Sequence, residues 1–356
     1  MKESLAVKYR PKTWSQVTEQ SSVRTILEQQ IASSNICHSL LFIGSAGCGK
    51  TTCARIFANE VNQGKGTPIE LDAASNNGVD DVRRIIEQAQ TKSLDSEYKV
   101  FIIDECHSLS SQGWQAFLKL IEEPPAKSIF IFCTTNPEKI PKTIISRVQS
   151  YQFKKISQKG IVDRLRYVLK QEDAGTETIY PNARATVSQI HLSEALEYIA
   201  RIADGGMRDA LTLLDKCLSY SHEVTLRNVV EVLGTVDYDT MMKLTDAYLE
   251  LDRKQVVEIL SYISDDGKDM KQFLKSYTHF LMDILKYMQG CGWAYLTMPN
   301  LPEYEDYLND IASDKDNYAL CLNLMTECVK LSSNIKYSAT PKLDIEAMFL
   351  IEMGDN

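Results

Sequence analysis

Residues 39–61 read SLLFIGSAGCGKTTCARIFANEV, and this stretch decides the fold. It opens with a short apolar run at 39–43, passes through a glycine-rich turn and continues at 51–61 in a pattern typical of a helix. Residues 44–51 fit G-x-x-x-x-G-K-[ST] at every position. A strand before this pattern and a helix after it are the context of a phosphate-binding loop.

Such a loop binds phosphate because its glycines let backbone N–H groups, together with the helix N-terminus, face the negative charge. Lys50 should bridge the β- and γ-phosphates, and the Thr51 hydroxyl should bind Mg²⁺. A glycine-rich turn without a ligand is the alternative. We expect ATP and Mg²⁺, held in this stretch by Gly44, Ser45, Ala46, Gly47, Cys48, Gly49, Lys50, Thr51 and Thr52.

Apolar runs and helical patterns alternate as far as residue 155. Strands are expected at residues 39–43, 69–72, 99–103, 128–133 and 150–153, and helices at 51–61, 79–89 and 111–122. The run KVFII at 99–103 is continuous, as in a strand covered on both faces. This alternation predicts a parallel, doubly wound α/β sheet.

Strand patterns fade after residue 155, and helical patterns take over. Helices are expected at residues 160–170, 193–202, 207–218, 254–263 and 271–288, with a loop or hairpin at 290–302. At 356 residues the chain is too long for one ordinary core. We expect an α/β domain at 1–155, a small helical domain at 156–233 and a larger all-α domain at 234–356.

Charge is unevenly placed along the chain. The net charge is −9, from 39 Lys and Arg against 48 Asp and Glu. Residues 235–356 hold 11 basic and 21 acidic residues, which leaves 28 and 27 for the rest. A uniformly basic nucleic-acid coat is therefore excluded, and DNA would need a local patch on the first two-thirds. The acidic last third suits protein contacts or a solvated surface.

Cysteine spacing and hydropathy indicate a cytoplasmic protein. None of the nine cysteines forms a C-x-x-C pair, so reduced thiols are expected rather than disulfides or a metal site. No apolar run approaches the length of a membrane span, and the first ten residues lack the apolar core of a secretory signal. We expect no membrane association.

Two acidic residues follow the run at 99–103. Asp104 and Glu105 would stand at the carboxyl end of a buried strand, where ligands bind in doubly wound sheets. Asp104 would hold Mg²⁺, and Glu105 would orient and polarise the attacking water. Strands often end in exposed carboxylates, but 54 residues beyond Lys50 this pair, with the phosphate loop, indicates hydrolysis of the nucleotide.

The segments DECHSLSSQGWQAFLKLIEEPP from Asp104 and TTNPEKIPKTIISR ending at Arg147 resemble the gamma/tau subunits of bacterial DNA polymerase III. LDAAS at 71–75, YRP at 9–11 and GMRDAL at 206–211 belong to the same resemblance. It covers roughly the whole chain, and most strongly residues 5–155. It implies a P-loop AAA+ domain, a helical lid domain and a helical collar domain that joins subunits. The helices of residues 234–356 equally suit a core within one subunit.

The resemblance also implies roles for single residues. Thr135, or its neighbour Asn136, matches the sensor of the γ-phosphate. Arg147 matches the arginine finger that reaches the ATP of the next subunit, and Arg208 matches a second sensor from the lid. From the residues alone both would be ordinary surface arginines. The segment matched to the adenine site contains Ala6, Tyr9, Arg10 and Pro11.

The chain departs from the family pattern at several places. The cysteine-rich zinc module is missing, since only residues 62–68 separate the phosphate-loop helix from the second strand, so we expect no zinc. Glu19 stands where glycine is usual, which bears on the adenine contacts, and Val148 replaces a cysteine after the finger. We also expect no long C-terminal extension.

The expected partners follow from the family. They are a sliding clamp, primer–template DNA held by its backbone, and other loader subunits in a pentameric ring or spiral. Arg83 and Lys139 match DNA-contacting positions, although solvated charges would explain them equally well. Asn76, Asn77 and Gly78 replace basic residues of the family, which would weaken the contact with DNA.

The function expected is therefore that of an ATP-hydrolysing clamp loader subunit. One alternative is a loader subunit that binds ATP without hydrolysing it, although such subunits lose phosphate-loop residues that this chain keeps. The other is a DNA-remodelling AAA+ motor of the helicase type, which would normally carry a winged-helix domain at its C-terminus.

Overall fold

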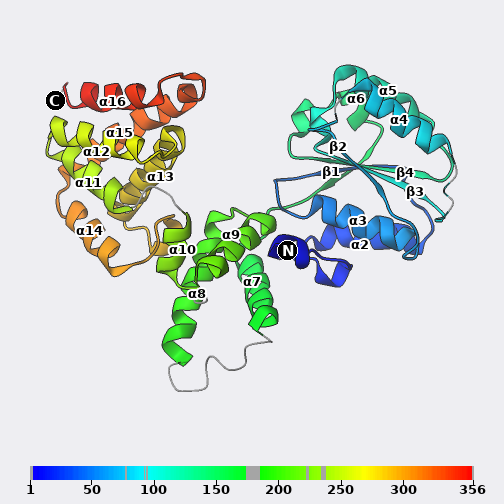
Figure 1. The fold of residues 1–356 in the computed structure, drawn as a ribbon, viewed down its shortest axis with the longest axis horizontal. Helices are drawn as coiled ribbons and strands as arrows, with labels where there is room; N and C mark the ends of the chain where they lie inside the picture. The colour runs from blue at the N-terminus through cyan, green and yellow to red at the C-terminus, as the bar shows by residue number, and fades with distance from the viewer. Residues whose placement is uncertain are drawn as a thin grey trace. The chain divides into compact units, whose positions relative to one another are not determined.

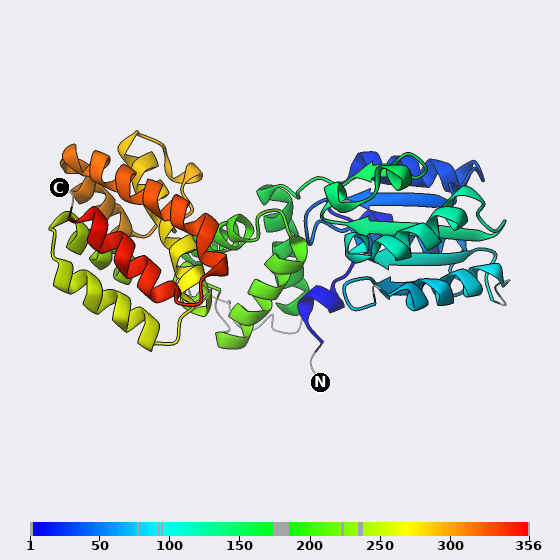
Figure 2. The same cartoon turned by 90° about the horizontal axis from the view of Figure 1, so that it is seen from above.

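Five strands form one parallel sheet in the first half of the chain (Figures 1 and 2). They are β1 (Ser39–Ile43), β2 (Ile69–Asp72), β3 (Lys99–Asp104), β4 (Ser128–Thr134) and β5 (Gln149–Gln152), in the order β2-β3-β4-β1-β5. The computed structural model describes residues 3–76, 78–91, 93, 95–173, 185–221, 224–233 and 238–354. The predicted doubly wound α/β fold is confirmed.

Helices cover both faces of the sheet (Figure 1). One face carries α2 (Ser21–Ala32) and α3 (Lys50–Val61), and the other carries α4 (Val79–Gln90), α5 (Ser111–Glu122) and α6 (Lys142–Ile145). Side chains alternate between the two cores, since Leu40 and Phe42 pack with α2 and α3 while Leu41 packs with α4 and α5.

The parallel register brings three functional strand ends to one edge of the sheet. Ile43 at the end of β1 pairs with Thr134 of β4, and Asp104 of β3 pairs with Asp72 of β2. The phosphate loop, the acidic pair and the residues after β4 therefore lie along the carboxyl edge, where open α/β sheets bind their ligands.

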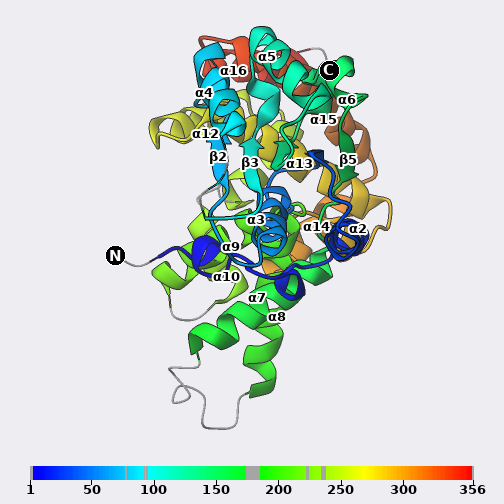
Figure 3. The ribbon, with the colours of Figure 1, turned by 90° about the vertical axis from the view of Figure 1, so that its right-hand side faces the viewer.

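The remaining elements of the first half frame that edge. The short N-terminal helix α1 (Leu5–Lys8) and the turn η1 (Trp14–Gln16) precede α2, and η2 (Cys106–Ser108) and η3 (Pro137–Lys139) follow β3 and β4. Three further helices are α7 (Gln158–Asp173), α8 (Ala185–Ile202) and α9 (Met207–Tyr220). Figure 3 shows the N-terminal segment between α3 and the helices α7 and α9.

The second half is helical throughout the part that the structure describes. Its elements are α10 (Leu226–Leu233), α11 (Tyr238–Leu249), α12 (Arg253–Asp265), α13 (Met270–Met288), η4 (Trp293–Tyr295), α14 (Pro302–Ser313), α15 (Asp316–Asn334), η5 (Ile335–Tyr337) and α16 (Pro341–Glu352). The long helix α13 is central, because it packs against α14, α15 and α16. Its buried side chains include Tyr277 and Phe280.

The chain divides into two compact units, Met1–Ser219 and Tyr220–Asn356. The domain boundary predicted at 233–234 falls beside residues 234–237, which lie outside the described part, so the three-domain division stays a prediction. Asn77, one of the substituted residues in the expected DNA-contacting segment, also lies outside the described residues. None of the helices described combines the length and apolar composition that a membrane crossing requires.

Candidate nucleotide-binding site

The phosphate loop fills the gap between the end of β1 and the start of α3. Close packing leaves no room for side chains at two of its glycines. A Cβ atom at Gly44 would lie 2.7 Å from the carbonyl oxygen of Phe153, and Gly47 has a φ of 69° with the Gly206 Cα 3.0 Å from such an atom. Only glycine adopts this φ freely, so the backbone shape of the loop requires glycine at this position.

Lys50 is the buried cation of this loop. Its side chain is 6% exposed, and its Nζ donates hydrogen bonds of 2.9 Å to the carbonyl oxygens of Gly44 and Ser45. These acceptors are neutral, and no carboxylate of the described residues pairs with the ammonium group. A buried, uncompensated positive charge favours an anion in the loop.

Thr51 and Asp104 meet at the first turn of α3. The Thr51 hydroxyl donates to Oδ2 of Asp104 over 2.8 Å, and Oδ1 of Asp104 accepts from the backbone N–H of Glu105 over 3.0 Å. A hydroxyl and a carboxylate are oxygen ligands of the kind that Mg²⁺ prefers, so this pair fits the ion. The two residues that the sequence assigned to Mg²⁺ therefore lie within hydrogen-bonding distance of each other.

Glu105 has an unusual backbone conformation. Its φ is 45°, in the left-handed region that non-glycine residues rarely occupy and that is common at functional sites. Its Oε2 accepts from the Thr135 hydroxyl over 3.2 Å and lies 3.2 Å from Nδ1 of His107. The Thr135 hydroxyl also lies 2.8 Å from Oδ1 of Asn136. Thr135 thus reaches the site through the Glu105 carboxylate.

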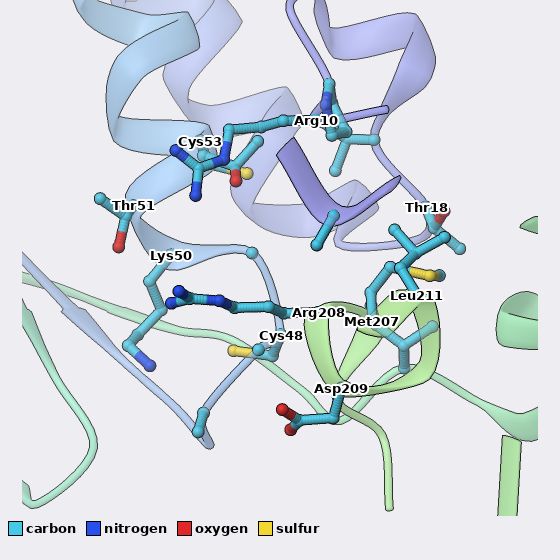
Figure 4. A pocket seen from close by; sticks show the side chains of 18 of the residues that line it. Arg10, Thr18, Cys48, Lys50, Thr51, Cys53, Met207, Arg208, Asp209 and Leu211 are labelled. Atoms are coloured by element: carbon cyan, nitrogen blue, oxygen red, sulfur yellow. The ribbon is translucent and has the colours of Figure 1, made fainter. Parts of the chain in front are cut away.

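A cavity of about 300 Å³ opens beside these residues, in the size range of ligand pockets (Figure 4). It lies within the first compact unit. Of the predicted site residues, it is lined by Ala6, Tyr9, Arg10, Pro11, Ala46, Gly47, Cys48, Gly49, Lys50, Thr51, Thr52, Asp104, Glu105 and Arg208. Gly44 and Ser45 lie outside the lining and contribute the carbonyl groups that hold Lys50.

Two arginines add positive charge to the cavity. Figure 4 shows Arg10, from the N-terminal segment, and Arg208, from α9, extending toward the end that holds Lys50 and Thr51. Within the described part of the chain, neither guanidinium group has a hydrogen-bond or ion-pair partner. Burial, with the nearby charges of Arg55 and Arg208, lowers the pKa of Arg10. Unpaired cations around a phosphate loop favour a polyanion.

The start of α9 touches the phosphate loop directly. The backbone N–H of Met207 donates to the carbonyl oxygen of Gly47 over 3.0 Å. This contact places the first turn of α9, and with it Arg208, at the mouth of the loop. The site is therefore built from the sheet edge, the N-terminal segment and the helices α7 and α9.

Several lining residues were not predicted from the sequence. The polar ones include Arg164 on α7, whose Nη2 donates to the carbonyl oxygen of Tyr9 over 2.8 Å. Helical periodicity placed a helix here but could not show which side chain reaches a segment 155 residues earlier. The other unpredicted lining residues are Val17, Thr18, Cys53, Ile156, Met207, Asp209 and Leu211.

Arg147 lies away from this cavity. Its Nε donates to Oε1 of Glu122 over 2.7 Å, and its Nη1 donates to the carbonyl oxygen of Thr143 over 2.9 Å. The side chain is 40% exposed and does not line the cavity of its own subunit. If Arg147 contacts a nucleotide, we therefore expect that nucleotide to be bound by a different subunit.

The two predicted DNA-contacting residues are exposed. Arg83 on α4 is paired with Asp80 over 3.0 Å, and Lys139 ends the turn η3. Asp80 and Asp81 occupy the first turn of α4, so the N-terminus of this helix carries negative charge. The two predicted residues come from separate elements, and neither lies in the nucleotide cavity.

Comparison with known proteins identifies the family. Residues 67–157 match the profile described as DNA polymerase III, delta subunit, and residues 189–223 match the profile of the ATPase lid domain of the DNA polymerase III clamp loader subunit. The tau subunit of Bacillus subtilis DNA polymerase III is 34% identical over 80% of this chain. The chain belongs to the gamma/tau family of DNA polymerase III clamp loader subunits.

The matched region covers different shares of the other gamma/tau relatives. The gamma/tau subunit of Mycoplasma genitalium is 31% identical over 90% of this chain and 54% of its own length. The gamma subunit of Buchnera aphidicola is 29% identical over 97% of both chains. The chain spans about half the length of the Bacillus and Mycoplasma relatives, at 52% and 54%.

A solved structure of similar fold is a mutant of RuvB from Thermotoga maritima. It has a TM-score of 0.50 and 18% identity, and the match covers 68% of this chain and 81% of that one. At this identity the likeness concerns the fold alone, and it agrees with the P-loop α/β architecture described above.

Proposed function

We propose that this chain is an ATP-hydrolysing subunit of a sliding-clamp loader, which uses ATP to open a clamp and place it on primer–template DNA. The observation that carries this proposal is the convergence of Lys50, the Thr51–Asp104 pair and Glu105 on one cavity. Membership of the gamma/tau family supports the clamp and DNA as partners.

The site residues divide into binding and chemical roles. Lys50 and the backbone of the phosphate loop bind the β- and γ-phosphates, and Arg208 and Arg10 add charge from the lid and the N-terminal segment. Thr51 and Asp104 would hold Mg²⁺, which would neutralise charge that develops on the phosphoryl oxygens. The γ-phosphate sensor is Thr135, next to Asn136.

Glu105 is the residue that we assign to activation of water. Glu105 lines the cavity, and its carboxylate accepts from Thr135 and lies 3.2 Å from Nδ1 of His107, so two neighbours restrain it. A carboxylate aimed at the water behind the γ-phosphate orients that water and accepts its proton. Its strained backbone supports a catalytic role, because such strain is kept where function needs it.

Arg147 completes the site of a neighbouring subunit. Its distance from its own cavity supports action in trans, as the family resemblance implies. A planar guanidinium group stabilises the charge that builds up on the transferred phosphoryl group. Hydrolysis then depends on assembly, for which a pentameric ring or spiral, joined through residues 234–356, is our proposal.

The proposed DNA contact is made by two exposed basic residues. Arg83 and Lys139 would contact the backbone of primer–template DNA, which gives affinity without sequence preference. Pairing of Arg83 with Asp80 reduces the charge that it can offer. The cytoplasmic location and the lack of a zinc ion stay predictions.

Two other functions agree less well with the chain. A DNA-remodelling motor of the helicase type would normally carry a winged helix, and no strand occurs beyond residue 220 among the residues that the structure describes. A loader subunit without hydrolysis would not need the paired Thr51 and Asp104 next to Glu105. Both are less well supported than an active ATPase.

The test is steady-state ATP hydrolysis by the chain assembled with its loader partners. We expect slow hydrolysis that rises at least tenfold when the cognate clamp and primed DNA are both added, because they complete the subunit interfaces. Binding of ATP with no hydrolysis under any of these conditions would favour the non-hydrolysing alternative. Stimulation by DNA alone, indifferent to the clamp, would favour the remodelling motor.

A further inference from the structure

The N-terminal wall of the cavity is held by helices α7 and α9. The backbone N–H of Leu5 donates to Oδ2 of Asp215 on α9 over 3.2 Å. The Nζ of Lys8 donates to Oε1 of Glu172 on α7 over 2.7 Å. Ala6, Tyr9, Arg10 and Pro11 line the cavity from this segment. The wall of the cavity is therefore fixed by contacts far from it in sequence.

Tyr9 is the residue most firmly held. Arg164 donates to its carbonyl oxygen over 2.8 Å, and the Tyr9 hydroxyl donates to Oε1 of Glu172 over 2.6 Å. Arg164 and Glu172 are eight residues apart, or about two turns of one helix. The helix α7 thus fixes both the backbone and the side chain of Tyr9.

Arg164 is not a surface charge. Its side chain is partly buried, its guanidinium lies 4.9 Å from the ring centre of Tyr167, and burial lowers its pKa. Among the described residues no carboxylate pairs with it. Its hydrogen bond to a neutral carbonyl is therefore the interaction that fixes it, and a charged donor makes a strong bond of this kind.

The position of Arg164 indicates which part of a nucleotide it serves. Figure 4 shows Thr18, Met207 and Leu211 at the end of the cavity opposite Lys50 and Thr51. Arg164 also lines the adjoining surface hollow, together with Val17 and Thr18. Since the phosphates belong at Lys50, the opposite and more apolar end receives the nucleoside.

We propose that Arg164 is a positioning residue that fixes the nucleoside-side wall of the cavity by holding Tyr9 in place. Affinity for the base and sugar of ATP then depends on Arg164, whereas affinity for the triphosphate depends on the phosphate loop. The inference rests on the proposed function only in taking the ligand to be ATP.

The experiment compares two ligands by titration calorimetry on the purified chain, with Mg²⁺ present. One ligand is ATP, and the other is inorganic tripolyphosphate, which lacks the nucleoside. We expect Arg164→Met to weaken ATP binding about tenfold, the loss typical of one charged hydrogen bond. Affinity for tripolyphosphate should stay the same within twofold.

Arg166→Met is the matched control. Arg166 lies on the same helix, is exposed, and donates to Oγ of Ser193 rather than to the wall of the cavity. It should change neither affinity. Arg164→Lys keeps the charge but loses the planar donor geometry, so it should lie between wild type and Arg164→Met in ATP affinity, and it also serves if the methionine variant does not fold.

The outcomes separate the inference from the proposed function. If Arg164→Met lowers the affinities for ATP and for tripolyphosphate equally, the inference is overturned, because Arg164 would then act on the phosphates or on the whole fold. Unchanged ATP affinity would overturn it as well. A wild-type chain that binds neither ligand would instead contradict the proposed function.

Discussion

At the scale of single residues, the buried environment of Lys50 favours anion binding. Its ammonium group has already lost most of its water, and it is held by two carbonyl oxygens that a phosphate can replace. We expect Lys50→Ala to lower ATP affinity at least a hundredfold, since it removes a buried charge–phosphate contact. Calorimetric titration with ATP would measure this, and a loss below threefold would contradict the assignment.

Glu105 should affect chemistry rather than binding. Glu105→Gln keeps the size of the side chain but cannot accept a proton, so we expect kcat to fall by about 10²–10³ with ATP affinity within threefold of wild type. Quench-flow hydrolysis and equilibrium binding measure the two quantities. Glu123→Gln, at an exposed acid following α5, is the control and should leave both unchanged.

The sequence predicted the site residues unevenly, for a physical reason. Residues close in sequence, such as those of the phosphate loop, have a fixed local geometry, and all but two line the cavity. Arg164 and Glu172 could not be predicted, because their partner Tyr9 is more than 150 residues away. It was predictable that Thr51 and Asp104 lie at the same edge, because a parallel sheet brings the carboxyl ends of its strands together, but their direct hydrogen bond was not.

At the scale of elements, the first turn of α4 carries negative charge, which should oppose binding of DNA there. Asp80 and Asp81 add negative charge at the helix N-terminus and pair with Arg83 and Arg84 over 3.0 and 3.5 Å. Replacing both by asparagine should tighten binding to primer–template DNA several-fold. It should also steepen the dependence of log K on log salt by about 1–2, one counterion for each freed arginine.

Fluorescence anisotropy across a salt series would measure this effect in the assembled loader. Glu87→Gln is the matched control, because Glu87 is an exposed acid near the other end of the same helix. The DNA assignment for α4 would be wrong if the Asp80 and Asp81 variant behaved like this control.

Helix α13 contains a buried carboxylate, Asp283, which should make the free energy of unfolding depend on pH. Its Oδ2 accepts from the backbone and hydroxyl of Thr297 and from the backbone of Met298, while burial raises its pKa. A raised pKa stabilises the fold below the unfolded pKa of about 4, and this stabilisation is lost as the pH rises. Asp283→Asn cannot ionise, so the difference between its free energy of unfolding and that of wild type should shift in favour of the variant as the pH rises above about 4.

Urea unfolding followed by circular dichroism at several pH values would measure that difference. Asp306→Asn, at an exposed position on α14, provides the baseline. A difference between wild type and Asp283→Asn that stays constant with pH would show that the carboxylate keeps its charge without cost.

The elements themselves were largely predictable. Helix α5 agrees with its predicted bounds, because Ser110 caps its N-terminus by accepting from Gly113 and two prolines stop it after Glu123. The expected loop at 290–302 contains only the short turn η4 and the first residue of α14. The order of the strands was not predictable, because the sequence pattern does not show whether a connection between two successive strands leads to a neighbouring or a more distant position in the sheet.

At the scale of the whole molecule, Arg147 lies apart from the other cations assigned to the nucleotide site. The cavity gathers Lys50, Arg10 and Arg208, whereas Arg147 is paired with Glu122 outside it. This exposed pair is held weakly enough to be exchanged for a stronger partner. We therefore expect such a subunit to bind ATP alone but to hydrolyse it fast only beside a neighbour.

Clamp- and DNA-stimulated hydrolysis by an Arg147→Ala assembly tests this claim most directly. We predict that the variant binds ATP like wild type, keeps the slow rate of the isolated subunit, and loses stimulation by about 10³ or more. An Arg147→Ala assembly that hydrolyses ATP at the full stimulated rate would contradict the account.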